Sequence, residues 1–294
     1  AAHAAALPGR LQPNCNELIA MSLPLTLNRS GAGRPAWPTT LWREAWHGDA
    51  VLMAFASILF ALMVPMAVGL ALDDRVLRGV PVWLKPMKFA LSLGVLAWTT
   101  AYFAAMVDAS RRHSLAAVRW TLIGAASFEL IYIALQAARG EGSHYNVGDR
   151  LHGTLYQLMG LGAVLLTATQ ARLAWLVARH ARPGFDPAYR LSVVLGLAFA
   201  FGLGTLSGAP LSAFQPPDAS ALPVFGWHAT GDLRPAHFVG LHAEQVLPLI
   251  GAWAVARQVR HARTIVIASA LAWLMLFGTL FALGLAGARL ATGY

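Results

Sequence analysis

The chain has 294 residues, of which 57% are hydrophobic and only 12% are charged, and its formal net charge is +9. A soluble domain carries about 25% charged residues, so this composition excludes an ordinary soluble protein and indicates an integral membrane protein. The 20 arginines and 2 lysines are spread over successive loops and form no basic stripe interleaved with aromatic residues. This pattern argues against nucleic-acid binding and favours topology signals and lipid contacts.

Seven segments are long and apolar enough to cross a bilayer, for which a helix needs about 20 mostly apolar residues. They are predicted at 50–72, 87–107, 115–138, 151–171, 190–213, 235–256 and 264–286, and the fourth has an apolar continuation to Ala178. We therefore expect an all-α fold in which residues 1–49 form a cytoplasmic N-terminal tail. Residues 50–294 then form one transmembrane bundle of seven helices.

The orientation of the bundle is predicted from its basic residues, because cytoplasmic loops of membrane proteins carry an excess of lysine and arginine. With seven spans, the side that holds the N-terminus carries 14 of these residues and the other side carries 8. We expect the N-terminus inside and the C-terminus outside.

The second span opens with the chain's two lysines, Lys85 and Lys88. Their side chains can simply extend to the outer interface. The alternative is that they help to hold an anionic group together with Arg139 and Arg234.

The third span carries a polar stripe, because Glu129, Tyr132 and Gln136 recur at helical spacing. Glu129 falls near the middle of the membrane, where a carboxyl group is a candidate for function or for a hydrogen bond between helices. Tyr156 and Gln157 of the fourth span are expected to meet this stripe.

The loop between the third and fourth spans concentrates polar side chains in the segment Arg139-Gly-Glu-Gly-Ser-His144-Tyr-Asn-Val-Gly-Asp149-Arg150-Leu-His152. Asp149 is placed to cap the fourth span. His144 and Asn146 are candidates for binding a metal, a headgroup or an anion, although a solvated loop histidine is an open alternative.

In the fifth span, Gly204 and Gly208 form a G-x-x-x-G pattern. This spacing lets another helix approach closely, unless these are ordinary glycines of a membrane helix. The connection that follows, 214–233, is rich in proline and aromatic residues. It is interpreted either as a lid over a site or as an anchor in the headgroup region.

The sixth span begins in the segment Gly231-Asp232-Leu-Arg234-Pro-Ala-His237-Phe-Val-Gly-Leu-His242-Ala-Glu244-Gln245. His237 and His242 are five residues apart, about 140° of helical rotation, so one helix does not aim both at a single metal ion. His242 shares a face with Gln245, and His237 shares another with Glu244. Glu244 lies more than two turns inside the span, where an ionisable group must be paired, protonated or beside water.

The predicted topology brings both polar segments to the outer face, where five of the ten histidines lie. Imidazole groups above buried carboxyl groups favour a metal or haem site. The candidate metal ligands are His144, His152, His237 and His242. Glu129 and Glu244 are candidate proton-handling groups, and the candidate ligand-binding groups are Lys85, Lys88, Arg139, Asn146, Arg234 and Gln245.

Three motifs carry a family resemblance: Lys85-Pro-Met-Lys-Phe, Arg139-Gly-x-x-Ser-His-x-Asn and Gly231-Asp-Leu-Arg-x-x-His-Phe-x-Gly-x-His. Together they are similar to a group of bacterial polytopic inner-membrane proteins without an established activity. The resemblance implies the seven-helix architecture and a location in the bacterial inner membrane, and it implies no mechanism.

Three functions follow from these residues. The first is a membrane enzyme or redox protein, such as an oxidoreductase, that holds haem or a transition metal at its outer face. The second is a carrier or channel for a small anionic or proton-coupled solute, although deep polar residues on the inner half are sparse. The third is a non-catalytic subunit or lipid-binding partner of a membrane complex. The bilayer and a small-molecule ligand are the expected partners.

Overall fold

The computed structural model describes residues 37–218 and 226–287, and within these residues the fold is all-α apart from one small hairpin. The helices are α2 (Trp37–Gly48), α3 (Ala50–Leu72), α4 (Leu84–Ala104), α5 (Arg112–Arg139), α6 (Arg150–His180), α7 (Pro187–Ala213), α8 (Arg234–Ala256) and α9 (Ala262–Leu285). A 3-10 turn, η1 (Ala109–Arg111), precedes α5, and the hairpin pairs β1 (Val76–Leu77) with β2 (Val80–Pro81).

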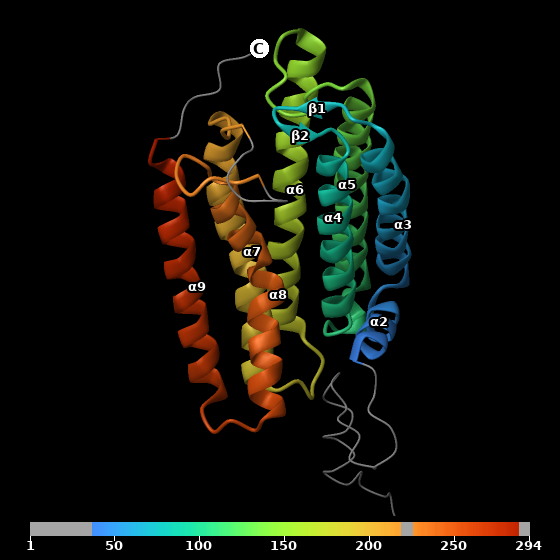
Figure 1. The fold of residues 1–294 in the computed structure, drawn as a ribbon. Coiled ribbons are helices and arrows are strands. Elements are labelled where there is room, and N and C mark those ends of the chain that lie inside the picture. The colour runs from blue at the N-terminus through green and yellow to red at the C-terminus, as the bar shows by residue number, and fades with distance from the viewer. Residues whose placement is uncertain (1–36, 219–225, 288–294) are drawn as a thin grey trace, which may run out of the picture.

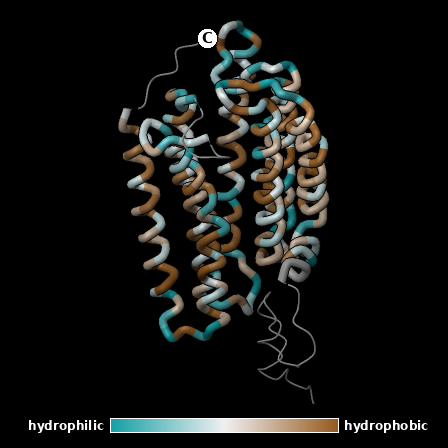
Figure 2. Tube along the Cα trace, viewed as in Figure 1, coloured by the Kyte–Doolittle hydropathy of each residue, from teal (hydrophilic) through white to brown (hydrophobic). Residues whose placement is uncertain are grey.

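Seven of the described helices, α3 to α9, are long and apolar enough to span a membrane, and this supports a multi-pass membrane protein. Figure 2 shows hydrophobic residues along the length of these helices and hydrophilic residues gathered toward their ends. The predicted spans agree with the helices, and the fourth continues to His180.

The helices form two groups that meet at α6. In Figure 1, α3, α4 and α5 stand on one side of α6, and α7, α8 and α9 stand on the other. The second group is held together by close packing of α7 on α8. A Cβ added at Gly204 would lie 2.7 Å from Leu241, and one added at Gly208 would lie 3.3 Å from His237. The predicted close approach at the G-x-x-x-G pattern is confirmed.

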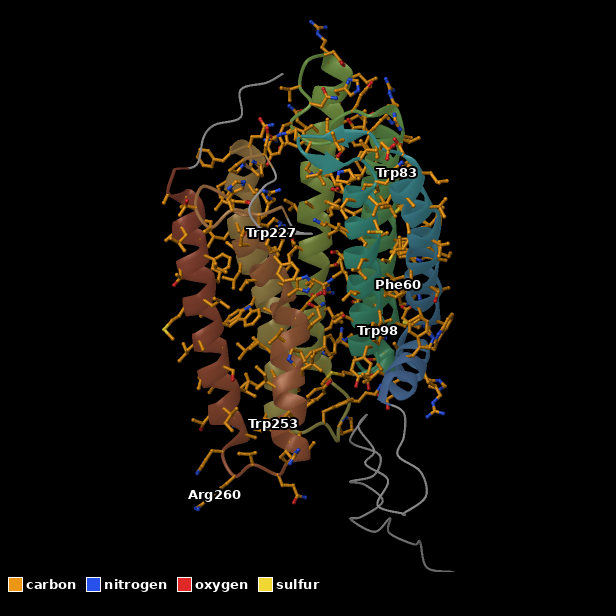
Figure 3. All side chains as sticks on the ribbon, in the orientation of Figure 1. Phe60, Trp83, Trp98, Trp227, Trp253 and Arg260 are labelled. Carbon is orange, nitrogen blue, oxygen red and sulfur yellow. The ribbon has the colours of Figure 1, made fainter. Side chains whose placement is uncertain are left out.

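Helix α2 was not predicted, and it lies within the segment 1–49 that was expected to form a tail. It packs on the first group through Trp42, whose ring lies 6.3 Å from Phe60 and 5.9 Å from Trp98. Figure 3 labels Phe60 and Trp98, which lie toward the α2 end of that group. Its last residue, Gly48, meets α4 so closely that an added Cβ would lie 2.0 Å from the carbonyl oxygen of Ala101. Residues 1–36 of the predicted tail lie outside the described residues.

Aspartates begin several helices. Asp49 accepts hydrogen bonds from the first turn of α3, and the guanidinium group of Arg119 on α5 lies 3.1 Å from the same carboxylate. Asp149 caps α6 by accepting from the backbone N–H of His152 at 3.0 Å, which confirms its predicted role. These caps satisfy backbone N–H groups that have no partner within their own helix.

Candidate functional site

Both predicted polar segments lie at the same end of the bundle, the end that carries β1 and β2 (Figure 1). We call it the hairpin end. Side chains tie its loops together. Arg78 of the hairpin lies 2.6 Å from Asp218, and the hydroxyl group of Tyr156 donates to the carbonyl oxygen of Ser212 at 2.7 Å. The hydroxyl group of Tyr145 donates to the carbonyl oxygen of Leu211.

Lys85 is turned inward and holds the loop between α5 and α6. Its ammonium group lies 2.8 Å from Ser143 Oγ and 3.0 Å from His144 Nδ1. The ring of His144 packs between the rings of Phe89 and Tyr156. Burial, and after it the Lys85 charge, hold the pKa of His144 well below its usual 6.5. A neutral imidazole accepts the Lys85 hydrogen bond at Nδ1.

Basic groups from three elements gather around this lysine. Lys85 lies close enough to Arg78 of the hairpin and Arg234 of α8 for their charges to interact, and Lys88 interacts in the same way with Arg234. Arg234 is paired with the buried Asp232 at 2.7 Å. Arg78 is paired with Asp218 at 2.6 Å. We call Arg78, Lys85, Lys88 and Arg234 the cationic cluster.

Glu129 lies on α5 and is only 4% exposed. Its carboxyl group faces α6, where a Cβ added at Gly162 would lie 3.1 Å from Oε1. Lys85 is the charge that acts on it. Within the described residues no hydrogen bond joins Glu129 to another side chain. The charge of Lys85 therefore acts on Glu129 at a distance and not through a direct contact.

The rest of the predicted stripe on α5 takes other roles. Gln136 donates to Glu141 at 3.2 Å and to the carbonyl oxygen of Gly142 at 3.1 Å, so it supports the loop. Tyr132 has a buried hydroxyl group without a partner among the described residues. Tyr156, expected beside this stripe, instead donates to the end of α7, and Gln157 is exposed.

A second polar network lies deeper, on α8. The side-chain nitrogen of Gln245 donates to Glu244 Oε1 at 2.8 Å and to Thr99 Oγ1 of α4 at 3.3 Å. The amide oxygen of Gln245 accepts a hydrogen bond from His242 Nδ1 at 3.1 Å. The predicted pairing of His242 with Gln245 is confirmed. Glu244 Oε2 is buried and lacks a hydrogen-bond partner in the described part of the chain.

We call the two rows of residues on α4 and α8 that meet at Thr99 and Gln245 the seam. On α4, Lys85, Lys88, Ser92 and Thr99 recur at helical spacing, and on α8, Phe238, His242 and Gln245 do the same. The seam is bridged where Gln245 bonds to Thr99. Nearer the hairpin end its side chains are more open, since Ser92 is exposed and Phe238 is 42% exposed.

The four predicted metal ligands lie in four different surroundings. His144 contacts Lys85, His242 contacts Gln245, and His237 Nδ1 lies 3.1 Å from Ser207 Oγ on α7. His152 lies 2.5 Å from Asp149 and 3.4 Å from Glu141. His237 is not hydrogen-bonded to Glu244, although the two were expected to share a face. In the residues that the structure describes, no group of three or more His, Cys, Asp or Glu side chains is arranged to hold a metal ion.

The remaining predicted ligand-binding residues shape or border the loop. Arg139 pairs with Glu141 at 3.3 Å, and its side chain is 61% exposed. The side chain of Asn146 donates to the carbonyl oxygen of Gly142 at 3.1 Å. Part of the expected lid, residues 219–225, lies outside the described residues, while Trp227 packs on Phe238 with 5.4 Å between ring centroids.

Sequence reasoning missed three residues of these networks. Ser143 stands beside His144 in a segment already chosen, and its position in the motif was the available signal. Arg78 lies in a tight turn with a positive φ of 53°. Thr99 is a single hydroxyl group in an apolar helix, and its sequence surroundings do not reveal a partner on α8.

Comparison with known proteins finds no family model, no curated protein and no solved structure that matches the chain.

Proposed function

We propose that this protein binds a small anionic solute in the seam and carries it across the membrane. The observation that carries the proposal is the cationic cluster, in which Arg78, Lys85, Lys88 and Arg234 come together from the hairpin, α4 and α8. Like charges repel one another, and an anion bound among these cations relieves the repulsion. Carboxylate and phosphate groups match such donors.

The seam supports a path for the solute beyond the cluster. Thr99 follows Lys85 by fourteen residues, which is about 21 Å along α4. Polar contacts continue toward the other end, because Thr100 accepts from Gln170 of α6 at 3.3 Å. One turn further, the hydroxyl group of Tyr102 interacts with Glu44 of α2 and Tyr189 of α7. These groups supply polar residues on the half of the membrane where the sequence indicated few.

The carrier is favoured over the metal or haem enzyme by the partners of the histidines. Each of the four candidate ligands contacts a side chain of its own, and the described residues hold no metal-binding trio. Metal and haem binding therefore remain predictions from the sequence. With the orientation predicted from the basic residues, the hairpin end faces outward from a bacterial inner membrane, and the cluster then meets solutes in the periplasm.

Uptake into proteoliposomes tests the proposal. Purified protein is reconstituted, and the entry of labelled phosphate and of small mono- and dicarboxylates is measured with and without protein. We expect saturable uptake of at least one of these anions, which Lys85→Gln reduces and Arg139→Gln leaves intact. Arg139 is the matched control because it is basic, lies at the same end and is exposed.

The same preparation separates the carrier from the enzyme. An absorption spectrum and an elemental analysis are recorded before reconstitution. If the protein contains stoichiometric haem or transition metal and takes up none of these anions, the carrier is rejected in favour of the redox protein.

A further inference from the structure

Glu244 lies next to Gln245 of the seam, and no charged group among the described residues acts on it. It lies ten residues into α8, about 15 Å from the start of that helix, and it is 3% exposed. Gln245 donates to one carboxyl oxygen, and the other is buried without a partner. A buried carboxylate that is left half satisfied costs several kcal/mol, so the group needs a counterion or a proton.

The surroundings of Glu244 supply no counterion among the described residues. On its own helix it faces the uncharged Gln245, and His242 beyond it is turned toward the Gln245 oxygen. From α4 the nearest group of this network is the hydroxyl of Thr99. From α7 the backbone comes close at Gly196, where an added Cβ would lie 3.0 Å from Glu244 Cα. Among residues 37–218 and 226–287, no cation acts on Glu244.

Glu129 makes the contrast clear. It is equally buried, but the charge of Lys85 acts on it. Burial disfavours the ionised form of both acids, and for Glu129 a nearby cation offsets part of this cost. Glu244 is therefore the acid whose surroundings favour the protonated form more strongly.

The Gln245 amide connects Glu244 to the closure of the seam. Its two N–H groups go to Glu244 and to Thr99, and its oxygen accepts from His242, so the orientation of the amide is fixed by three partners. An ionised Glu244 attracts the amide more strongly than a protonated one, because hydrogen bonds to a charged acceptor are roughly twice as strong. Loss of the proton therefore pulls the amide toward α8 and weakens its bond to α4.

We propose that Glu244 is a proton-binding site that couples proton movement to opening of the seam and hence to transport. This inference rests on the proposed carrier function. The proton binds the free carboxyl oxygen and leaves from the same atom, and no covalent bond is made or broken. One proton carried with a monovalent anion makes the cycle electrically neutral, which reduces the cost of moving the anion through the apolar part of the bundle.

The proton site is tested first without any solute. Infrared difference spectra are recorded on protein in lipid nanodiscs as the pH is stepped, and the carbonyl band of a protonated carboxyl group is followed. We expect this band in the wild type, its loss in Glu244→Gln and its retention in Glu129→Gln. Retention of the full band in Glu244→Gln, or its absence from the wild type, would overturn the site. Glutamine keeps the size of the side chain, and thermal unfolding of each variant checks its fold.

The coupling is tested with whichever labelled anion the wild type transports. Two assays are compared in the same proteoliposomes, anion exchange without a gradient and accumulation driven by a pH gradient. We expect Glu244→Gln to keep exchange and lose accumulation. Asp108→Asn, at a surface turn on the opposite end of the bundle, should keep both.

The outcomes separate the two proposals. Accumulation by Glu244→Gln at the wild-type level, or wild-type uptake driven by sodium and indifferent to pH, would reject proton coupling and leave the carrier standing. Absence of uptake of every anion by the wild type would reject the carrier, and the infrared experiment would still decide whether Glu244 binds a proton.

Discussion

The two ends of the seam differ in the side chains that α4 contributes, which are cationic at one end and uncharged at the other. Toward the hairpin end, Lys85 and Lys88 lie among other cations and Ser92 is exposed. Toward the α2 end, Thr99 and Thr100 accept uncharged hydrogen bonds from α8 and α6. Like charges favour an anion bound among them, and neutral hydrogen bonds join helices. In the proposed carrier, the hairpin end would therefore bind the solute and the α2 end would close the seam.

Helix α2 reinforces the closed end. Trp42 packs against Phe60 and Trp98, and Glu44 interacts with Tyr102 of α4. Burial raises the pKa of the Glu44 carboxyl group above its usual value. The hairpin end has no comparable helix among the described residues, and its loops are held by side chains such as Arg78 and Tyr145. Closure of the seam is therefore expected to depend on packing at one end and on charge at the other.

The largest expected effect is the loss of α2 packing in Gly48→Ala. The new Cβ would lie 2.0 Å from the Ala101 carbonyl oxygen, a backbone atom that cannot turn aside. We expect a loss of about 3 kcal/mol in the free energy of unfolding, at the upper end for overpacking. The measurement is a denaturant titration in mild detergent. Gly124→Ala is the control, because an added Cβ there meets nothing within 4 Å. Equal stability of the two variants would contradict the close contact.

Removal of one charge from the binding end is the next effect in size. Lys85→Gln should weaken binding of the transported anion by about 2 kcal/mol, or roughly 30-fold, the value of one hydrogen bond to a charged group. Direct titration of the anion into purified protein measures it. The change should shrink as salt is raised, because exposed parts of the cluster are screened. Lys85→Arg restores the charge, and binding that stays weak in this variant would assign Lys85 to the loop and not to the ligand.

A pH effect on stability is expected from His144 at the hairpin end. Because the pKa of His144 lies well below 6.5 in the folded protein, the unfolded chain binds the proton first as the pH falls. Stability is then unaffected by this group above about pH 6.5 and declines below it, by up to about 1.4 kcal/mol for each pH unit. The decline begins between about pH 7 and pH 5, so unfolding titrations over this range should show the slope.

His144→Asn is expected to reduce that slope. His47→Asn, on the exposed face of α2, is the control at the other end and should leave it intact. A slope that is unchanged in His144→Asn would place the pH-sensitive group elsewhere.

Local features of the fold follow from the sequence, and contacts between helices do not. The apolar runs predict the spans, Asp149 predicts its cap, and the three-residue spacing predicts the bond of His242 to Gln245. Each of these depends on residues close along the chain. Helical periodicity tells which residues share a face, but not which helix that face meets.

The wrong and missing predictions concern contacts between helices. Tyr156 was expected to meet the polar stripe on α5, and its hydroxyl group instead donates to Ser212 of α7. The bridge from Thr99 to Gln245 joins residues 146 positions apart, and the sequence gives no sign of it. Helix α2 was not predicted, because a helix of 12 residues is too short to span a membrane and this one is also too polar.

The smallest expected effect compares one hydroxyl group from each end. The Tyr102 hydroxyl group interacts with Glu44 and Tyr189 inside the bundle. The Tyr156 hydroxyl group interacts with Tyr145 and donates an exposed hydrogen bond to Ser212. Water replaces an exposed bond and cannot reach a buried one, so Tyr102→Phe should cost about 1 kcal/mol and Tyr156→Phe about half as much. Thermal unfolding of both variants in one detergent gives the comparison. If Tyr156→Phe is the more damaging, the hairpin end is the better joined of the two, and the assignment of binding and closing ends must be reversed.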